Sequence, residues 1–118
     1  MTDSSQRFAE LKTRYEQSFG DKLAALQSAW RAFAAVPSAH AAPELQTIAH
    51  RLAGSAPAYG YEAIGAAAYA VDTIFNAWTK RPASDREDAG MLATELAAPM
   101  QALIDSLAHA LETTRQTG

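Results

Sequence analysis

The sequence predicts an all-α protein with the architecture of an antiparallel four-helix bundle. One of two interpretations of the first segment adds an extra N-terminal helix. Alanine, the best helix former, supplies 28 of the 118 residues, whereas valine and isoleucine together number six. So few β-branched apolar residues leave little material for a buried sheet. Apolar residues also recur at steps of three and four along four segments of the chain, which is the period of an amphipathic helix.

The first segment carries one long helical period, which ends at Val36–Pro37 because a residue before proline avoids the α conformation. Asp3 and Gln6 have the spacing of an N-terminal cap pair. The stripe keeps its phase through Gly20–Asp21, so either one helix passes that point or two collinear helices meet there. The apolar positions of this stripe are Phe8, Leu11, Tyr15, Phe19, Leu23, Leu26, Trp30 and Phe33.

The second and third segments predict a helical hairpin. The second helix starts within residues 38–43 and ends at residues 56–59, before Gly60, a natural left-handed cap. The third helix begins near Tyr61, and so short a turn makes the two helices antiparallel neighbours. The third helix ends at residues 80–82, which include a proline. The two stripes are Leu45, Ile48, Ala49, Leu52 and Ala56, then Tyr61, Ile64, Ala68, Val71, Phe75 and Trp78.

The fourth segment opens with Ser84-Asp85-Arg86-Glu87, a capping-box pattern, and the fourth helix is predicted to start there. Pro99 lies inside the apolar run, and we expect a kink near Leu96 because proline removes a backbone donor and crowds the preceding turn. The stripe of this helix is Leu92, Leu96, Met100, Leu103, Leu107 and Leu111.

Composition excludes several classes of function. The chain has no cysteine, which rules out disulfides, thiolate metal sites and thiol catalysis. A net charge of -3 and a pI of about 5.5 argue against nucleic-acid binding. Neither a membrane-spanning apolar run nor the order of a signal peptide is present. We expect a single cytoplasmic domain over residues 1–118, with no membrane or nucleic-acid partner and no metal or cofactor of its own.

His50 is the most informative residue, because it lies outside the apolar stripe of the second helix. Three and four residues away lie Gln46, Thr47, Ala53 and Gly54, so its surroundings are polar on one side and nearly bare on the other. A helical glycine costs about 1 kcal/mol relative to alanine, which this sequence uses freely elsewhere. Close approach of another body beside the imidazole is one reason for the glycine, and relief of helix packing is the alternative.

The same stretch carries a recognisable pattern. After the histidine come a hydrophobic residue two positions on, Gly54 four positions on, small residues, and Gly60 closing the helix. This pattern resembles the histidine phosphotransfer (HPt) family. The likeness is sharpest over residues 45–75, where Val71 and Asp72 also resemble the next helix of that family. Chain length and helix order extend it over the whole sequence.

The resemblance implies a histidine phosphotransfer protein on a four-helix bundle. His50 then accepts a phosphoryl group from a receiver-domain aspartate or a partner kinase and relays it to another receiver. The implied partners are receiver domains and a sensor histidine kinase. Mg²⁺ and most of the catalysis are expected on the receiver, so this chain is not itself an enzyme. The residues expected to contact the partner or the phosphoryl group are Gln46, Thr47, Arg51, Ala53, Gly54 and Pro57.

One departure from the family pattern supports a second hypothesis. Many members carry a lysine three residues after the histidine, whereas this chain has Ala53. Arg51 is cationic, but one residue from His50 it points about 100° away round the helix. The alternative is therefore an HPt-like adaptor that binds a receiver or kinase without transfer. In either case we expect a monomer, because both partners need access to one histidine.

Overall fold

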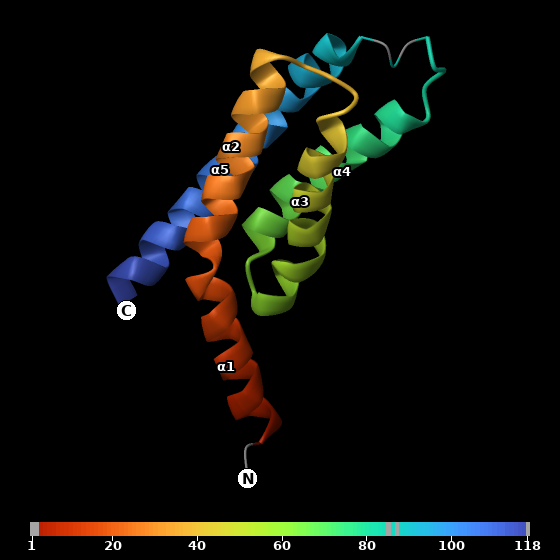
Figure 1. The fold of residues 1–118 in the computed structure, drawn as a ribbon. Coiled ribbons are helices and arrows are strands. Elements are labelled where there is room, and N and C mark those ends of the chain that lie inside the picture. The colour runs from red at the N-terminus through yellow and green to blue at the C-terminus, as the bar shows by residue number, and fades with distance from the viewer. Residues whose placement is uncertain (1–2, 85, 87, 118) are drawn as a thin grey trace.

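The computed structural model describes residues 3–84, 86 and 88–117, and across these residues it contains helices and turns but no strand. Four helices, α2 to α5, alternate in direction and form the bundle, while α1 extends past its lower end (Figure 1). The all-α antiparallel bundle is confirmed. The elements are α1 (Ser4–Gln17), α2 (Phe19–Ala35), α3 (Ala42–Ser55), the short 3-10 helix η1 (Pro57–Tyr59), α4 (Glu62–Thr79) and α5 (Ala89–Thr117).

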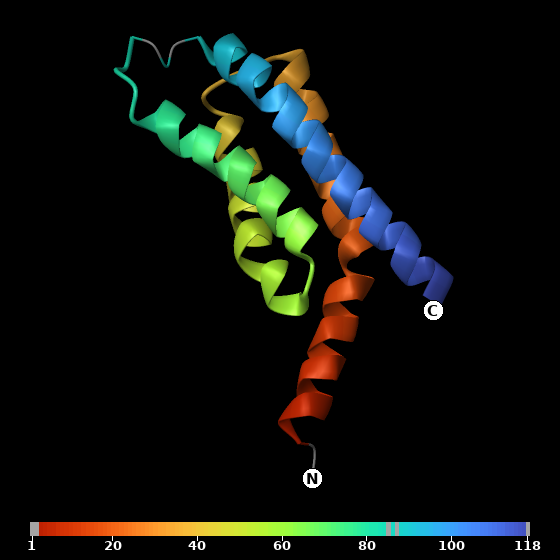
Figure 2. The same ribbon diagram turned by 180° about the vertical axis from the view of Figure 1, so that it is seen from behind.

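Each bundle helix packs against two neighbours. α2 contacts α3 and α5, and α4 contacts α3 and α5, with the most extensive contacts made by α4. Figure 2 shows the same closed arrangement from behind. The predicted stripes face one another inside it, and the largest fully buried side chains are Phe19, Phe33, Phe75, Leu26, Leu45, Leu52, Ile64, Leu92, Leu96, Met100, Leu103 and Leu107.

The α3–α4 hairpin follows the sequence prediction closely. Pro43 lies in the first turn of α3, and α4 starts directly after Tyr61. Gly60 has a φ of 87°, the left-handed conformation that glycine adopts without strain, and its backbone N–H donates to the Pro57 carbonyl. The turn therefore ends the first helix and reverses the chain within a few residues.

The first stripe is divided between two helices. α1 and α2 meet at Ser18, two residues before the predicted Gly20–Asp21 junction, so the two-helix reading is confirmed and its position is shifted. The Ser18 hydroxyl donates to the Tyr15 carbonyl, a local bond that competes with the helical ladder. The two helices are not collinear, because α1 leaves the bundle at an angle to α2 (Figure 1).

The stripe on α1 does not enter the core. Phe8 and Leu11 are 47% and 42% exposed, and burial begins only at Phe19. α1 is instead attached to the α3–α4 turn by aromatic contacts: the Tyr15 and Tyr59 rings stack at 4.6 Å, and the Tyr15 hydroxyl lies 2.6 Å from the Ser55 hydroxyl. Periodicity identified the amphipathic helix correctly, but it carries no information about which partner covers the stripe.

The start of α5 was predicted too early. α5 begins at Ala89, where the Asp88 carboxylate accepts a hydrogen bond from the Gly90 N–H at 3.0 Å. Ser84 lies in the preceding turn, and two positions of the predicted capping box, Asp85 and Glu87, lie outside the described residues. α5 continues through Pro99 as one helix, and the kink near Leu96 stays a prediction.

None of the helices within the described ranges is both long enough and apolar enough to cross a membrane.

The environment of the Tyr61 hydroxyl predicts how the stability of the fold changes at alkaline pH. It donates to the Glu16 carboxylate, and burial together with this acceptor and its negative charge raises the pKa of Tyr61 from 10.0 to about 12. The folded state thus favours the neutral phenol, so this contribution to stability is complete below pH 10 and is lost as the pH rises towards 12. Tyrosinate absorbance during a pH titration should show this late step, and Tyr61→Phe should remove it. Persistence of the step in Tyr61→Phe would contradict the assignment.

Candidate functional site

His50 lies on the outer side of α3. Its neighbours along the helix, Leu45, Ala49 and Leu52, are buried in the core, whereas the His50 side chain is 74% exposed. This exposure agrees with its predicted position outside the apolar stripe. A helix held by one apolar stripe leaves its opposite side free, and the histidine stands on that free side.

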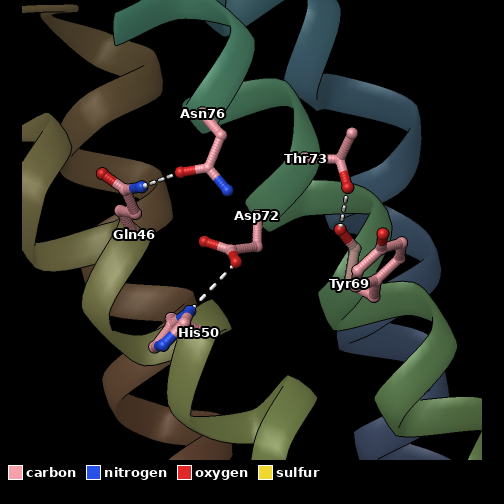
Figure 3. A network of polar contacts seen from close by, with 6 residues as sticks. All are labelled: Gln46, His50, Tyr69, Asp72, Thr73 and Asn76. Atoms are coloured by element: carbon pink, nitrogen blue, oxygen red, sulfur yellow. Dashed lines mark hydrogen bonds and ion pairs between the residues drawn. The ribbon is translucent and has the colours of Figure 1, made fainter.

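Among the described residues, the ring is hydrogen-bonded through one nitrogen only. His50 Nδ1 lies 3.0 Å from Oδ2 of Asp72 on α4 (Figure 3). A carboxylate can only accept, so this bond places the proton of the neutral ring on Nδ1 and leaves a lone pair on Nε2. Figure 3 shows Nε2 on the side of the ring away from Asp72. The arrangement presents one exposed, unprotonated nitrogen that can act as a nucleophile.

Asp72 itself is buried. Its side chain is 10% exposed, and its second oxygen, Oδ1, is fully buried without a hydrogen-bond partner among the described residues. Asp72 was not among the site residues predicted from the sequence. The available signal was a single carboxylate, between Val71 and Phe75, inside an otherwise apolar stripe of α4.

A second polar contact joins the same two helices one turn away. Gln46 Nε2 donates to Asn76 Oδ1 at 3.1 Å, four residues before His50 on α3 and four after Asp72 on α4 (Figure 3). The two contacts therefore follow one antiparallel register. Gln46 and Asn76 also line an open groove beside the imidazole, and the complete lining is Pro43, Gln46, Thr47, His50, Arg51 and Asn76.

A scan against protein-family models matches residues 10–117 to the Hpt domain. This chain belongs to the Hpt domain family. The match covers all four bundle helices and confirms the resemblance read from the sequence. Neither the curated proteins nor the solved structures gave a match to this chain. Hpt domains take part in histidine phosphotransfer in phosphorelays, as intermediates rather than catalysts, and they interact with receiver domains and histidine kinases.

The structure of this Hpt domain brings only part of the predicted set together. Gln46, Thr47 and Arg51, three of the residues expected to contact a partner, share the groove with His50. Ala53 is half-buried against the core and so presents little surface to a partner. Ala53 does not line the groove.

Gly54 and Pro57 lie beyond His50 towards the turn. A Cβ at Gly54 would meet nothing within 4 Å, so relief of helix packing, the alternative interpretation of this glycine, is wrong. The space beside the ring is open within this chain. Pro57 has a structural contact that the sequence analysis did not foresee, because its ring packs against the bare backbone of Gly65 on α4.

Gly65 is the glycine at which two helices of this domain approach closely. A Cβ there would lie 2.3 Å from Pro57 Cγ, which is far inside van der Waals contact with a stiff ring. Pro57 on η1 and Gly65 on α4 lie directly beyond the two polar contacts, seven residues after His50 and seven before Asp72 in the sequence. The glycine therefore allows η1 to approach α4 closely at the turn beyond the site.

A pair of alanine substitutions distinguishes the two glycines. Gly65→Ala should destabilise the domain by about 1–3 kcal/mol, because the methyl group forces the Pro57 ring or a helix to move. Gly54→Ala should leave stability unchanged or raise it by up to about 1 kcal/mol. Chemical denaturation measures both values. Equal effects of the two variants would contradict the assigned packing, and Pro57→Ala should relieve part of the Gly65→Ala defect.

Proposed function

We propose that this Hpt domain accepts a phosphoryl group on His50 from the aspartyl phosphate of a receiver domain and passes it to a second receiver. The exposed ring, bonded through Nδ1 and free at Nε2, is the observation that carries the proposal. Phosphoryl transfer needs a positioned nucleophile and neutralised charge more than it needs covalent help from the protein. An imidazole on a rigid helix meets the first requirement.

Phosphoryl transfer from the receiver to His50 requires no proton to pass between the two proteins. The Nε2 lone pair of His50 attacks phosphorus, and the bond between phosphorus and the receiver's carboxylate oxygen breaks. The electron pair of that bond stays on the carboxylate, and the Nδ1 proton stays where Asp72 holds it. Mg²⁺, which offsets the charge of the transferring group, belongs to the receiver in this proposal. The described residues contain no cluster of three or more metal-ligating side chains.

The surface around the ring supports docking on two sides. The groove supplies neutral polar groups on one side, and among its described lining residues Arg51 alone carries a permanent charge. Gly54, one turn beyond the ring, is exposed with open space beside it, so a partner backbone can approach closely there. We assign Arg51 the role of the cation nearest the phosphoryl group, in place of the lysine that Ala53 replaces.

The second candidate is the adaptor, which binds a receiver or kinase without accepting phosphate. The half-buried Ala53 favours it, because the lysine position of many relatives here offers no charge. Binding is common to both candidates, so only covalent transfer separates them.

His50→Gln is the decisive variant for transfer. Incubation with a panel of phosphorylated receiver domains should label the native chain in an acid-labile, base-stable form, and His50→Gln should remain unlabelled. Because the ring is exposed and glutamine keeps an N–H donor for Asp72, the variant should stay folded, with an unfolding midpoint close to the native one. Full labelling of His50→Gln would overturn the acceptor assignment, and a native chain that binds receivers without being labelled would establish the adaptor.

Gly54→Leu tests the approach of the partner. Gly54 is exposed and a Cβ there meets nothing within 4 Å, so stability should hold. Transfer from a receiver should fall about tenfold or more through steric exclusion, equivalent to about 1.4 kcal/mol. Ala97→Leu is the matched control, an exposed position on α5, which packs on α2 and α4 rather than beside the groove. Receiver-dependent transfer kinetics measure both. Equal transfer rates in the two variants would place the docking surface elsewhere.

A further inference from the structure

Tyr69 on α4 is a tyrosine whose side chain the packing of the domain does not use. The other three tyrosines, Tyr15, Tyr59 and Tyr61, are half-buried and form ring contacts around the α3–α4 turn. Tyr69 is 68% exposed, and among the described residues its ring has no aromatic or cationic neighbour and its hydroxyl has no hydrogen-bond partner. The Thr73 hydroxyl donates to its backbone carbonyl at 2.9 Å and not to its side chain (Figure 3). The phenol ring therefore contributes little to the stability of the fold.

The outer face of α4 makes this ring conspicuous. The exposed positions around it are small, and they include Ala63, Ala66, Ala70 and Thr73. Alanine favours the helix over tyrosine by roughly 0.5 kcal/mol, so the helix itself would be better served by alanine at this position too. The result is a single large side chain that stands on a flat surface of small ones. Single exposed apolar residues are common, so the position of the ring decides whether it has a function.

Tyr69 lies beside His50 without touching it. The contact of His50 with Asp72 sets the antiparallel register of α3 and α4. Three residues on along α3 and three residues back along α4, Ala53 and Tyr69 lie opposite each other in this register. Packed helices and one turn of offset separate the His50 and Tyr69 backbones by about 10 Å. Figure 3 shows the Tyr69 ring on the far side of Asp72 from the imidazole, and so away from the transferring group.

The ordinary size of a protein interface connects the two positions. A specific interface covers about 800 Å² on each partner, and a patch of that area extends about 16 Å from its centre. A domain centred on the imidazole, as delivery of a phosphoryl group to Nε2 requires, therefore also covers Tyr69. Tyrosine is one of the residues that most often dominate binding energy, because its rigid ring buries a large area at a small cost in conformational entropy.

We propose that Tyr69 is an anchor for the receiver domain that exchanges phosphate with His50, and that it helps to select that receiver. The inference rests on the proposed function and adds the α4 side of the helical hairpin to the docking surface. A matching receiver then carries an apolar pocket about 10 Å from its phosphorylated aspartate, with a hydrogen-bonding group for the phenol. A receiver without this pocket clashes with the ring or leaves it unpacked, which is a basis for selectivity.

The position of Tyr69 favours a receiver over a second copy of this chain. A second copy seated on the ring would lie over His50 as well and would block the residue that the relay needs. Two copies would also each bring a net charge of -3 to the contact.

Tyr69→Ala tests the inference in the intact chain. The variant should have native stability or slightly more, because the side chain is exposed and alanine is the better helix former. Its kcat/KM for transfer from a phosphorylated receiver should fall about 10- to 30-fold, the usual size of the loss of a dominant interface side chain. The change should lie in the apparent KM for the receiver, with kcat close to the native value. Tyr69→Phe should keep most of the native rate, because it keeps the ring.

Two controls separate docking from chemistry and from general surface effects. Phosphoramidate is a small phosphoryl donor that needs no docking surface, so it should label His50 at the same rate in the native chain and in Tyr69→Ala. Met91→Ala removes another exposed apolar side chain, 53% exposed at the start of α5, where it lines a different groove from the one beside His50. This variant should receive phosphate at the native rate.

Three results would overturn the inference. One is an unchanged apparent KM of Tyr69→Ala for every receiver that labels the native chain. Another is slower labelling of Tyr69→Ala by phosphoramidate, which would place the residue in the chemistry instead of in docking. The third is a native dimer in sedimentation that Tyr69→Ala dissociates, which would assign the ring to a second copy of the chain.

The two proposals can fail separately. A chain that binds receivers through Tyr69, but which none of them labels, keeps the anchor and loses the relay. A chain that receivers label equally well with and without the Tyr69 ring keeps the relay and loses the anchor.

Discussion

The close pairing of α3 with α4 is the constraint on which the site depends. Two hydrogen bonds join these helices, Gln46 with Asn76 and His50 with Asp72, and a third contact closes the turn beyond them, where Pro57 of η1 packs against Gly65 of α4. Each of the first two contacts is a single hydrogen bond. The third is a steric fit of a proline ring against a glycine backbone. Because the fit admits one spacing of the helices, the distance between imidazole and carboxylate follows from packing at the turn rather than from the strength of the hydrogen bond.

His50 is both exposed to solvent and held in one orientation, because the two nitrogens of its ring lie in different environments. Nδ1 of His50 meets a carboxylate that is itself inside the bundle, while most of the side chain remains in solvent. A ring that was free at both nitrogens would sample several rotamers and both tautomers. A ring buried in the core would be inaccessible to a partner. The helix stripe places His50 at the boundary, and the neighbouring helix removes its freedom there.

Much of the fold could be predicted because its signals are local. Apolar spacing identified the stripes of α3, α4 and most of α5, and Gly60 marked the turn by its left-handed conformation. The errors occurred where local signals compete or end. Ser84 offered a capping pattern, yet α5 begins at Ala89. Phe8 and Leu11 continue the stripe of the first segment but lie on a helix that the four bundle helices do not cover.

For the site, the sequence by itself determined the histidine, its place off the apolar stripe and the family pattern around it, since all of these lie within a few turns of one helix. Only the tertiary structure decided which nitrogen of His50 is held, because Asp72 is on another helix and its role depends on the register between the two. The same holds for the glycines: Gly54 was conspicuous in sequence and is open, while Gly65 was inconspicuous and carries the close approach. Helical period reports which face of a helix is apolar, but contact between helices depends on their spacing and register, which no single segment contains.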